Sequence, residues 1–504
     1  RLLVLVAGAA GQDLFLAAAP KNVPPTQDVV HHAADQFRSR WSSIRKEAVA
    51  DAAHGAAQGD VPSHCKLAII GAGWAGAYFA WRIAVDTNLM SPSDVCVFEA
   101  DARVGGRIFS VHDLPGFEDL VVDAGGYRFP ETDMLPADLV WKALRMPTAC
   151  YNWKCAKHCL SHTPGNCYVV KDAYGNNAGY AKPIETMLGQ LEEAGEGTQV
   201  FFGRRLIGLS GMSSPRHVAL HLATGEDVYA EQVLLNMPRN AVRQLDPNSV
   251  LFSDEAPKLK FDMMNITSQY ASKVYAYYRD AWWNSKLGIM DGEFRDDAYP
   301  APLHGRYHDG PQKCLVGHDP SGAPVYSGDK VQFGNCTGAL LVFYDDVDAL
   351  QYYRQFMTDS QKPLSLISYG SQQGKKIIQT VHKHLMEYHA SALQKIGVAP
   401  SELAPPEYLV ISNWIPEAKL LPSYGLNYLS NKVRAQMRTP TPNFNIFMSN
   451  VDYGYSRDAK DPWPWGWASD SLIMAEKLLQ AEFNMSRPVW LNDSWYSDHV
   501  LAVP

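Results

Sequence analysis

The sequence lacks a strong excess of charge of either sign. Among its 504 residues, 45 Lys and Arg stand against 53 Asp and Glu, which gives a formal net charge of −8. Without a basic surplus to neutralise phosphates, the composition argues against a nucleic-acid-binding protein. No run reaches the roughly 20 apolar residues that span a bilayer, so no transmembrane span is expected. No internal repeat is visible either, which disfavours solenoids and propellers.

Aromatic residues, in contrast, are abundant. The chain has 13 Trp, 25 Tyr and 18 Phe, and 46% of its residues are hydrophobic. Such a chain can bury a large core, which excludes wholesale disorder. The length predicts two or three domains, or one large two-lobed enzyme.

The eight cysteines contain no CxxC pair, so disulfides are a better interpretation than a metal site, and no metal is expected. The cysteines with disulfide spacing are Cys150, Cys155, Cys159, Cys167, Cys314 and Cys336. Cys65 and Cys96 flank the first β-α-β unit of the sequence and are interpreted as core residues.

Other features predict an exported protein. An apolar stretch, Leu2–Ala10, precedes the small residues Ala17–Ala19, as in a targeting signal. Sequons begin at Asn265, Asn335, Asn484 and Asn492. The expected location is therefore outside the cell or in an organelle lumen.

Hydrophobic patterning predicts strands of several lengths that alternate with helices. The expected strands are 66–70, 94–99, 200–209, 217–222, 232–237, 271–278, 340–344 and 444–448. The expected helices are 29–44, 71–85, 374–396 and 467–483. This alternation predicts an α/β (α+β) fold with two interleaved lobes.

A glycine motif directly follows the first expected strand. Gly71, Gly73 and Gly76 form GxGxxG, with Trp74 and Ala75 between them. The glycines permit a tight turn, close approach of a pyrophosphate and close packing of helix on strand. Glu99 ends the next strand, where a carboxylate can hold ribose hydroxyls. The pattern predicts a dinucleotide site.

Two further glycine pairs follow within 60 residues of the first motif. Ala100 and Arg103 lead into Gly105-Gly106-Arg107, and Asp123-Ala124-Gly125-Gly126 comes next. With these three elements in order, the chain resembles the flavin-containing amine oxidase family. That family includes monoamine, polyamine and L-amino-acid oxidases. The resemblance implies FAD as cofactor and a Rossmann-like FAD-binding domain interleaved with a mixed-sheet substrate domain.

The resemblance extends from about residue 64 to residue 482 and implies seven segments. Residues 1–63 are a targeting-like segment with an amphipathic helix, and 483–504 are a tail. The FAD-binding domain takes 64–130, 196–262 and 440–482. A helical insert with the Cys cluster takes 131–195, and the substrate-binding domain takes 263–439.

The resemblance also implies site residues. Arg128 occupies the place of an Arg that grips the substrate carboxylate in L-amino-acid oxidases, and Lys273 that of a Lys beside the flavin. Further substrate contacts are implied for Tyr307, Trp414, Trp465, Gly466 and Trp467. Cofactor contacts are implied for Tyr127, Arg128, Leu206, Asn450, Trp467 and Ala468 as well as the glycine motifs. The sequence departs from the family after the last strand, where Asn450-Val451-Asp452 replaces Gly-Glu, and Asp452 is a candidate substitute for the acid that contacts the ribitol.

The expected activity is FAD-dependent oxidative deamination of L-amino acids by O2, which yields 2-oxo acids, ammonia and hydrogen peroxide. A homodimer is a family-level expectation. Three alternatives remain open: a polyamine or monoamine oxidase, a decarboxylating amino-acid monooxygenase, and a non-catalytic assembly subunit of the same fold.

Overall fold

A computed structural model describes residues 60–502 with gaps. The gaps are 152–154, 156–157, 161–162, 215, 253–258, 260–262, 264–265, 270, 298–300, 328–333, 346–349, 358–361, 415–423, 428–430 and 455–467. The predicted helix at 29–44 lies outside the described residues.

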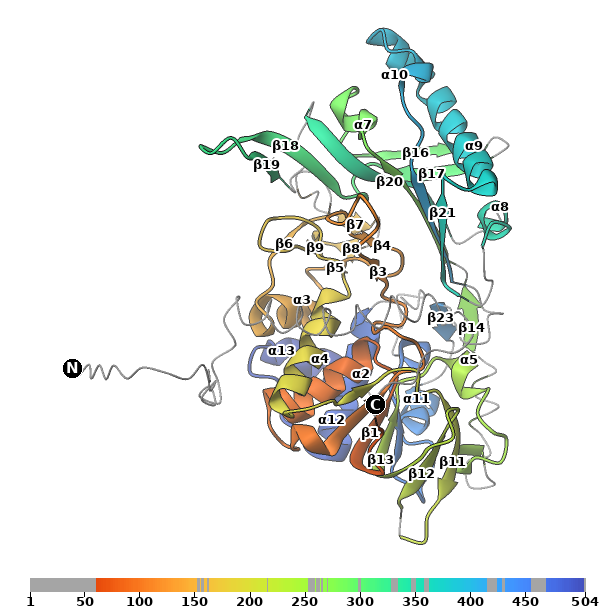
Figure 1. The fold of residues 1–504 in the computed structure, drawn as a ribbon. Helices are drawn as coiled ribbons and strands as arrows, with labels where there is room; N and C mark the ends of the chain where they lie inside the picture. Colours follow the sequence, from red (N-terminus) through yellow and green to blue (C-terminus); the bar gives the residue numbers. More distant parts are fainter. Residues whose placement is uncertain are drawn as a thin grey trace, which may run out of the picture.

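The first lobe is built on a seven-stranded, mostly parallel sheet (Figure 1). Its order is β10-β2-β1-β13-β12-β11, and β24 pairs with β13. The strands are β1 (His64–Ile70), β2 (Val95–Phe98), β10 (Val200–Phe201), β11 (Leu206–Gly211), β12 (Val218–Leu222), β13 (Asp227–Leu235) and β24 (Ile446–Met448). All pairs are parallel except β11–β12 and β12–β13. A parallel sheet is covered on both faces, which explains the almost continuous apolar run of β1.

Helices cover one face of this sheet and enclose a large apolar core. They are α2 (Trp74–Trp81), α3 (Met134–Asp138), α4 (Lys182–Ala194), α12 (Ala468–Phe483) and α13 (Asp493–Tyr496). A second core on the opposite face contains side chains from β11 and β12. It also receives residues from α5 (Arg239–Val242) and α11 (Asn431–Arg438).

The second lobe contains an eight-stranded antiparallel sheet (Figure 1). Its order is β16-β17-β20-β15-β22-β21; β18 also pairs with β20, and β19 pairs with β18. The strands are β15 (Ala271–Tyr278), β16 (Glu293–Asp296), β17 (Leu303–Arg306), β18 (Gln312–His318), β19 (Pro324–Ser327), β20 (Asn335–Asp345), β21 (Leu364–Ser368) and β22 (Tyr408–Trp414). The helices of this lobe are α7 (Trp282–Ser285), α8 (Leu350–Arg354), α9 (Gln372–Tyr388) and α10 (Ala390–Lys395).

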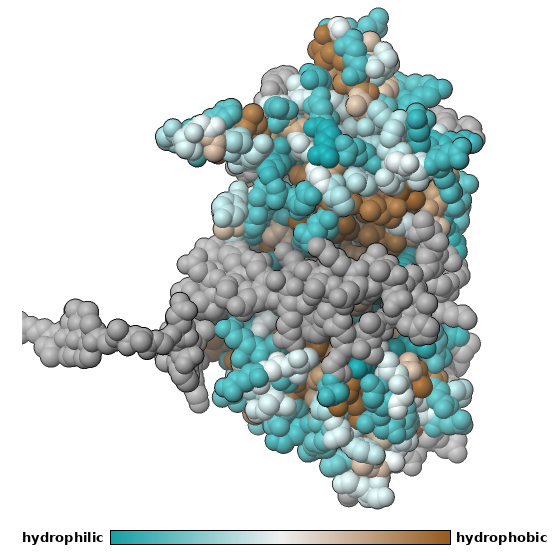
Figure 2. All heavy atoms as spheres, viewed as in Figure 1, coloured by the Kyte–Doolittle hydropathy of each residue, from teal (hydrophilic) through white to brown (hydrophobic). Residues whose placement is uncertain are grey.

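Small sheets lie between the two larger ones (Figure 1). They pair β3 (Ser110–Val111) with β4 (Val122–Asp123), β5 (Phe129–Pro130) and β6 (Thr148–Cys150) with β9 (Cys167–Val170), β7 (His158–Leu160) with β8 (Thr163–Pro164), and β14 (Ile266–Gln269) with β23 (Tyr424–Asn427). On the face seen in Figure 2, hydrophobic side chains gather on the part of the second lobe nearest the first.

Alternation along β15 decides which side chains face the first lobe. Val274 and Ala276 pack in the core beneath α9, whereas Tyr275 and Tyr277 belong to a separate cluster with the 114–122 loop. Lys273 shares the face of Tyr275 because side chains of a strand alternate with period two. The central strand of one lobe thereby presents a lysine to the other.

Several predicted elements differ in extent. The strand predicted at 200–209 is interrupted by a turn in which Gly203 has a φ of +66°, and it forms the separate strands β10 and β11. The helix predicted at 374–396 divides into α9 and α10 at His389, which leaves helical geometry with a ψ of 4°.

The described residues contain three disulfides, Cys65–Cys96, Cys150–Cys155 and Cys314–Cys336. The interpretation of Cys65 and Cys96 as core residues was incomplete. Both are buried, but they lie on the adjacent strands β1 and β2 with their Cα atoms 6.1 Å apart, which is within bonding reach. No helix in the described ranges is long and apolar enough to cross a membrane. Within the same ranges, no group of His, Cys, Asp and Glu could hold a metal ion.

Candidate cofactor and substrate site

The GxGxxG loop connects β1 to α2 and depends on its glycines. Gly71 has a φ of +103°, a backbone conformation that residues other than glycine rarely adopt. A Cβ at Gly76 would lie 2.1 Å from the Gly71 carbonyl oxygen. Gly73 is the N-cap of α2 and no side chain caps this helix, so its first turn can receive an anion. These observations fit a bound pyrophosphate.

Glu99 lies directly after β2 and is fixed beside the same loop. One carboxylate oxygen accepts the N–H of Ala72 at 2.8 Å, and the other accepts that of Asp101 at 2.9 Å. Burial raises the pKa of Glu99 to about 7, although both hydrogen bonds oppose this rise. Its remaining lone pairs can accept hydroxyl groups of a ribose.

Three glycine motifs that are separate in sequence meet in space. The N–H of Gly105 donates to the Ala72 carbonyl at 2.8 Å, and Gly73 forms an isolated bridge with Gly105. The N–H of Gly126 donates to the Arg107 carbonyl at 3.1 Å. A Cβ at Gly125 would lie 1.9 Å from the same carbonyl oxygen. The three glycine motifs thus form one continuous backbone surface, which we call the glycine cradle.

Arg103 makes local contacts, whereas Arg107 contacts a distant segment of the chain. The Arg103 guanidinium donates to the carbonyls of Val104, Gly106 and Ile108 and thereby holds the second glycine loop. Arg107 donates to Asp452 at 2.7 Å and to the Asn450 side chain at 2.6 Å.

Asp452, the candidate substitute for a ribitol-contacting acid, is thus bound to Arg107. Its other oxygen accepts the backbone N–H of Arg239 at 2.9 Å. Asn450 and Asp452 together hold the Arg107 side chain against the last strand of the first lobe.

The structure locates the other predicted cofactor residues as follows. Trp74 and Ala75 are buried in the first turn of α2, Leu206 is buried in β11, Ala468 begins α12, and Ala100 is exposed after β2. Trp465, Gly466 and Trp467 lie outside the described residues. The Trp414 indole N–H donates to the Ala124 carbonyl at 2.9 Å, so this side chain supports the third glycine motif.

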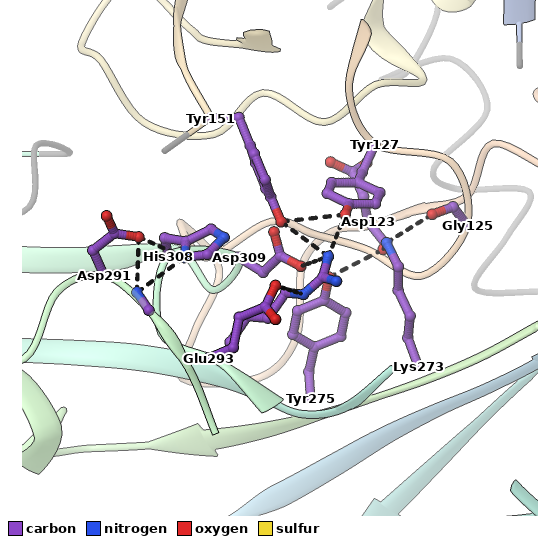
Figure 3. Close-up of polar contacts among 12 residues, drawn as sticks. Asp123, Gly125, Tyr127, Tyr151, Lys273, Tyr275, Asp291, Glu293, His308 and Asp309 are labelled. Carbon is purple, nitrogen blue, oxygen red and sulfur yellow. Dashed lines mark hydrogen bonds and ion pairs between the residues drawn. The ribbon is translucent and has the colours of Figure 1, made fainter. Parts of the chain in front are cut away.

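Lys273 reaches from the second lobe to that third motif (Figure 3). Its amine donates to the carbonyls of Asp123 at 2.9 Å and Gly125 at 2.8 Å. It also lies 3.5 Å from the centroid of the Tyr127 ring. The pKa of Lys273 is lowered to about 7, mainly by burial and also by Arg128 and Arg306, although Asp309 and Asp123 oppose this change. A neutral amine has two N–H groups, and the two carbonyls satisfy both.

We expect Lys273 to make the rate at which oxygen reoxidises the reduced flavin depend on pH. The family resemblance places Lys273 beside the flavin, where a positive amine would stabilise negative charge that develops on oxygen. Lys273 loses its charge as the pH rises through about 7. Reoxidation of the reduced enzyme should therefore be faster at pH 6 than at pH 8, by about tenfold. Lys273→Met should abolish this difference. Stopped-flow mixing with oxygen measures it, and Lys383→Met, which removes a lysine that is 77% exposed on α9, should keep it.

Arg128 is buried beside the lysine and only 5% exposed. Its guanidinium carbon lies 4.1 Å from the ring centroid of Tyr151 and 4.6 Å from that of Tyr127. Within the described part of the chain, its Nε and Nη1 have no hydrogen-bond partner. Such buried donors are costly to leave unsatisfied, so this guanidinium is suited to an anionic ligand.

Three residues that the sequence did not suggest, Tyr151, Arg306 and Asp309, lie near Arg128, and Figure 3 shows Tyr151 and Asp309 on the same side as Tyr127 and Lys273. Arg306, at the end of β17, donates to the hydroxyls of Tyr127 and Tyr151, both at 3.3 Å. Its Nε contacts Glu293 at 2.9 Å, and its Nη1 lies 3.9 Å from Asp309. Tyr151 lies in residues 131–195, which include the Cys cluster. Arg306 and Asp309 lie in residues 291–335, which are rich in Gly, Pro and Asp. Neither segment has a periodic hydrophobic pattern that would reveal these residues.

The substrate role of Tyr307 stays a prediction, and the structure shows its hydroxyl bonded within the second lobe. Its hydroxyl donates to His389 Nε2 at 2.6 Å, and His389 Nδ1 donates to the Leu385 carbonyl at 2.7 Å. Tyr307 belongs to the core beneath α9, whereas its neighbour Arg306 contacts Tyr127 and Tyr151. The adjacent residue, and not Tyr307, therefore lies beside Arg128.

Comparisons with known proteins agree with the first lobe. Residues 69–142 match a family described as an NAD(P)-binding Rossmann-like domain, which confirms the predicted dinucleotide-binding fold. Similar solved structures include two of putrescine oxidase, a triple mutant from a redesign of cofactor binding and the wild type bound to putrescine. Each is 13% identical, with a TM-score of 0.49, over 84% of this chain and 99% of the other. No curated protein sequence matches the chain.

Proposed function

We propose that this protein is an FAD-dependent oxidase that deaminates L-amino acids to 2-oxo acids and releases ammonia and hydrogen peroxide. The observation that supports the amino-acid substrate is Arg128. It is a buried guanidinium beside the third glycine motif, and its Nε and Nη1 have no hydrogen-bond partner among the described residues. A planar guanidinium binds a carboxylate through two parallel hydrogen bonds, which fixes position and orientation together.

The electrostatics around Arg128 favour an anionic group. Arg128, Lys273 and Arg306 lie around Tyr127 and Tyr151, and the buried carboxylate side chains near them in the described part of the chain include Asp309 and Asp123. Asp123 already accepts hydrogen bonds from Ser110 and from the backbone N–H of Tyr180. A site with this charge attracts a carboxylate more strongly than a simple amine. The aromatic rings of Tyr127 and Tyr151 exclude water from these groups, which strengthens each electrostatic contact.

FAD would lie along the glycine cradle, with its pyrophosphate at the N-terminus of α2 and a ribose at Glu99. When bound, FAD would accept the two electrons that are removed as the substrate Cα–N bond is oxidised, and it would pass them to O2. Arg128 would hold the substrate carboxylate. Lys273 would hold or release a proton at its own Nζ. Orientation of the substrate therefore accounts for most of the protein's contribution to rate.

A location outside the cell or in an organelle lumen accompanies this proposal. Disulfides persist in oxidising compartments, and the described residues contain three. The sequon residues Asn335, Asn484 and Asn492 are exposed. A homodimer remains part of the proposal.

Oxidation of a polyamine or monoamine is the second candidate. The observation in its favour is Asp309, a buried carboxylate near the same site whose oxygens accept no hydrogen bond from the described residues. A carboxylate there suits an ammonium group, and an amine substrate would make no use of Arg128.

The visible spectrum under anaerobic conditions separates these functions. The purified protein should show flavin absorbance that bleaches with a mixture of L-amino acids and persists with D-isomers, putrescine or benzylamine. Bleaching by amines alone would reject the amino-acid proposal in favour of amine oxidation. Ammonia and peroxide as products, with no carbon dioxide or amide, would exclude a decarboxylating monooxygenase. Absence of bound flavin after gentle purification would favour the non-catalytic assembly subunit.

A further inference from the structure

Asp309 is a buried carboxylate that the proposed function has not yet used. It lies in the loop after β17, and its side chain is 0% exposed. Among the residues that the structure describes, neither of its oxygens accepts a hydrogen bond. Its contact with Arg306, at 3.9 Å, is too long for a hydrogen bond. Burial of a carboxylate in this state is unfavourable unless a ligand satisfies it.

Asp309 and Arg128 lie at different parts of the same tyrosine. The Arg128 guanidinium carbon is 4.1 Å from the centroid of the Tyr151 ring. The Tyr151 hydroxyl contacts Arg306 Nη1, the atom closest to Asp309. The two charged groups therefore lie around the same tyrosine, and both act on its hydroxyl, whose pKa is raised by burial and by Asp309 and lowered by Arg128.

Asp309 remains charged at neutral pH. Burial alone would raise its pKa, but Arg306, His308, Arg128 and Lys273 lower it below its usual value. The anion of Asp309 and the cation of Arg128 are thus both buried around Tyr151. Each has polar atoms that find no hydrogen-bond partner among the described residues.

We propose that Asp309 binds the α-ammonium group of a free amino acid while Arg128 binds its α-carboxylate. The inference rests on the proposed function and narrows its substrate class to zwitterionic α-amino acids with both groups unblocked. The two protein charges are opposite and close, as are the two charges of the ligand. Amines, N-acyl amino acids and amino-acid esters each lack one of the two required charges.

Asp309 could instead serve only as a counter-ion for Arg306, but Arg306 has other partners. Its Nε contacts Glu293 at 2.9 Å, and its Nη1 donates to two tyrosine hydroxyls at 3.3 Å. Glu293 is 65% exposed, so Arg306 already has a carboxylate in contact with solvent. A counter-ion role therefore leaves the hydrogen-bonding capacity of Asp309 unexplained.

A pair of isosteric ligands tests the inference on the flavin-loaded, full-length protein. 1-Aminocyclohexanecarboxylate and 1-methylcyclohexanecarboxylate differ by an ammonium in place of a methyl group. Neither has a hydrogen on its α-carbon, so neither is oxidised. Calorimetric titration should show that the wild type binds the amino ligand more tightly. Asp309→Asn should weaken the amino ligand about tenfold or more. The same change should leave the methyl ligand equal or tighter, because it removes a repulsive charge.

Two further variants keep the result interpretable if Asp309→Asn folds poorly. Asp309→Glu retains the charge and should retain the preference for the amino ligand. Glu293→Gln removes the other carboxylate beside Arg306 and should not alter the preference. Equal changes for both ligands in Asp309→Asn would overturn the inference, as would a wild type that is bleached by L-amino acids yet prefers the methyl ligand. A wild type that binds neither ligand and is not bleached would overturn the proposed function itself.

Discussion

Arg128→Ala is expected to lower kcat/KM for L-amino acids by about 100-fold or more, mainly through a higher KM. The guanidinium is buried, and its Nε and Nη1 have no partner in the described ranges, so a bound carboxylate would make its full set of hydrogen bonds there. Alanine would leave that carboxylate desolvated without a cation. Steady-state kinetics, together with the concentration dependence of anaerobic flavin reduction, measure the loss.

Controls for this prediction use both protein and substrate. Arg128→Lys should recover only part of the loss, because an ammonium cannot form the planar pair of hydrogen bonds. Arg295→Ala removes a guanidinium that is 65% exposed and should have no effect. If the Arg128→Ala enzyme lost activity towards L-amino acids and a simple amine by the same factor, carboxylate recognition would be rejected and a structural role would remain.

Gly76→Ala is expected to abolish stable flavin binding. The new methyl group would lie 2.1 Å from the Gly71 carbonyl oxygen and 2.8 Å from the Asn236 amide nitrogen. The obstruction by Gly71 is backbone, so relief requires α2 to move away from β1, and this movement displaces the helix N-terminus from the pyrophosphate site. The flavin-to-protein absorbance ratio after gel filtration should fall close to zero, and the melting temperature should fall with it.

Gly317→Ala is the matched control, because a Cβ at this position in β18 meets nothing within 4 Å. It should retain flavin. Gly73→Ala is a graded case, since its closest contact would be 3.4 Å from the Asn236 amide nitrogen. We expect this variant to fold but to bind flavin more weakly, because the methyl group lies where backbone approaches the phosphates. Full flavin content in Gly76→Ala would show that the close packing at this turn is dispensable.

Much of the first lobe could be predicted because its signals are local. GxGxxG after an apolar strand specifies a turn and a helix, and Glu99 follows at the end of the next strand. The structure brings the three glycine motifs together through contacts such as Gly105 N–H to the Ala72 carbonyl. The cofactor and substrate roles of these residues, like the division into domains, remain predictions.

The substrate side was predicted less completely. Arg128 and Lys273 were identified by resemblance, but Tyr307 was chosen in place of Arg306. The two are neighbours, and sequence alone does not determine which side chain of a short strand end faces the other lobe. Asp309 and Tyr151 belong to segments without periodic pattern, so no local signal marks them.

The sequence by itself determined the dinucleotide-binding turn, the alternation of strands and helices, and the alternation that places Lys273 beside Tyr275 on one face of β15. These features depend on the conformational needs of glycine and on periodicity, which act over a few residues. Only the tertiary structure decided that Cys65 bonds Cys96, that Asp452 holds Arg107, and that Arg128 and Asp309 share Tyr151. Such contacts join segments up to several hundred residues apart, and they depend on which strands pair within the first lobe and on how the two lobes pack against each other.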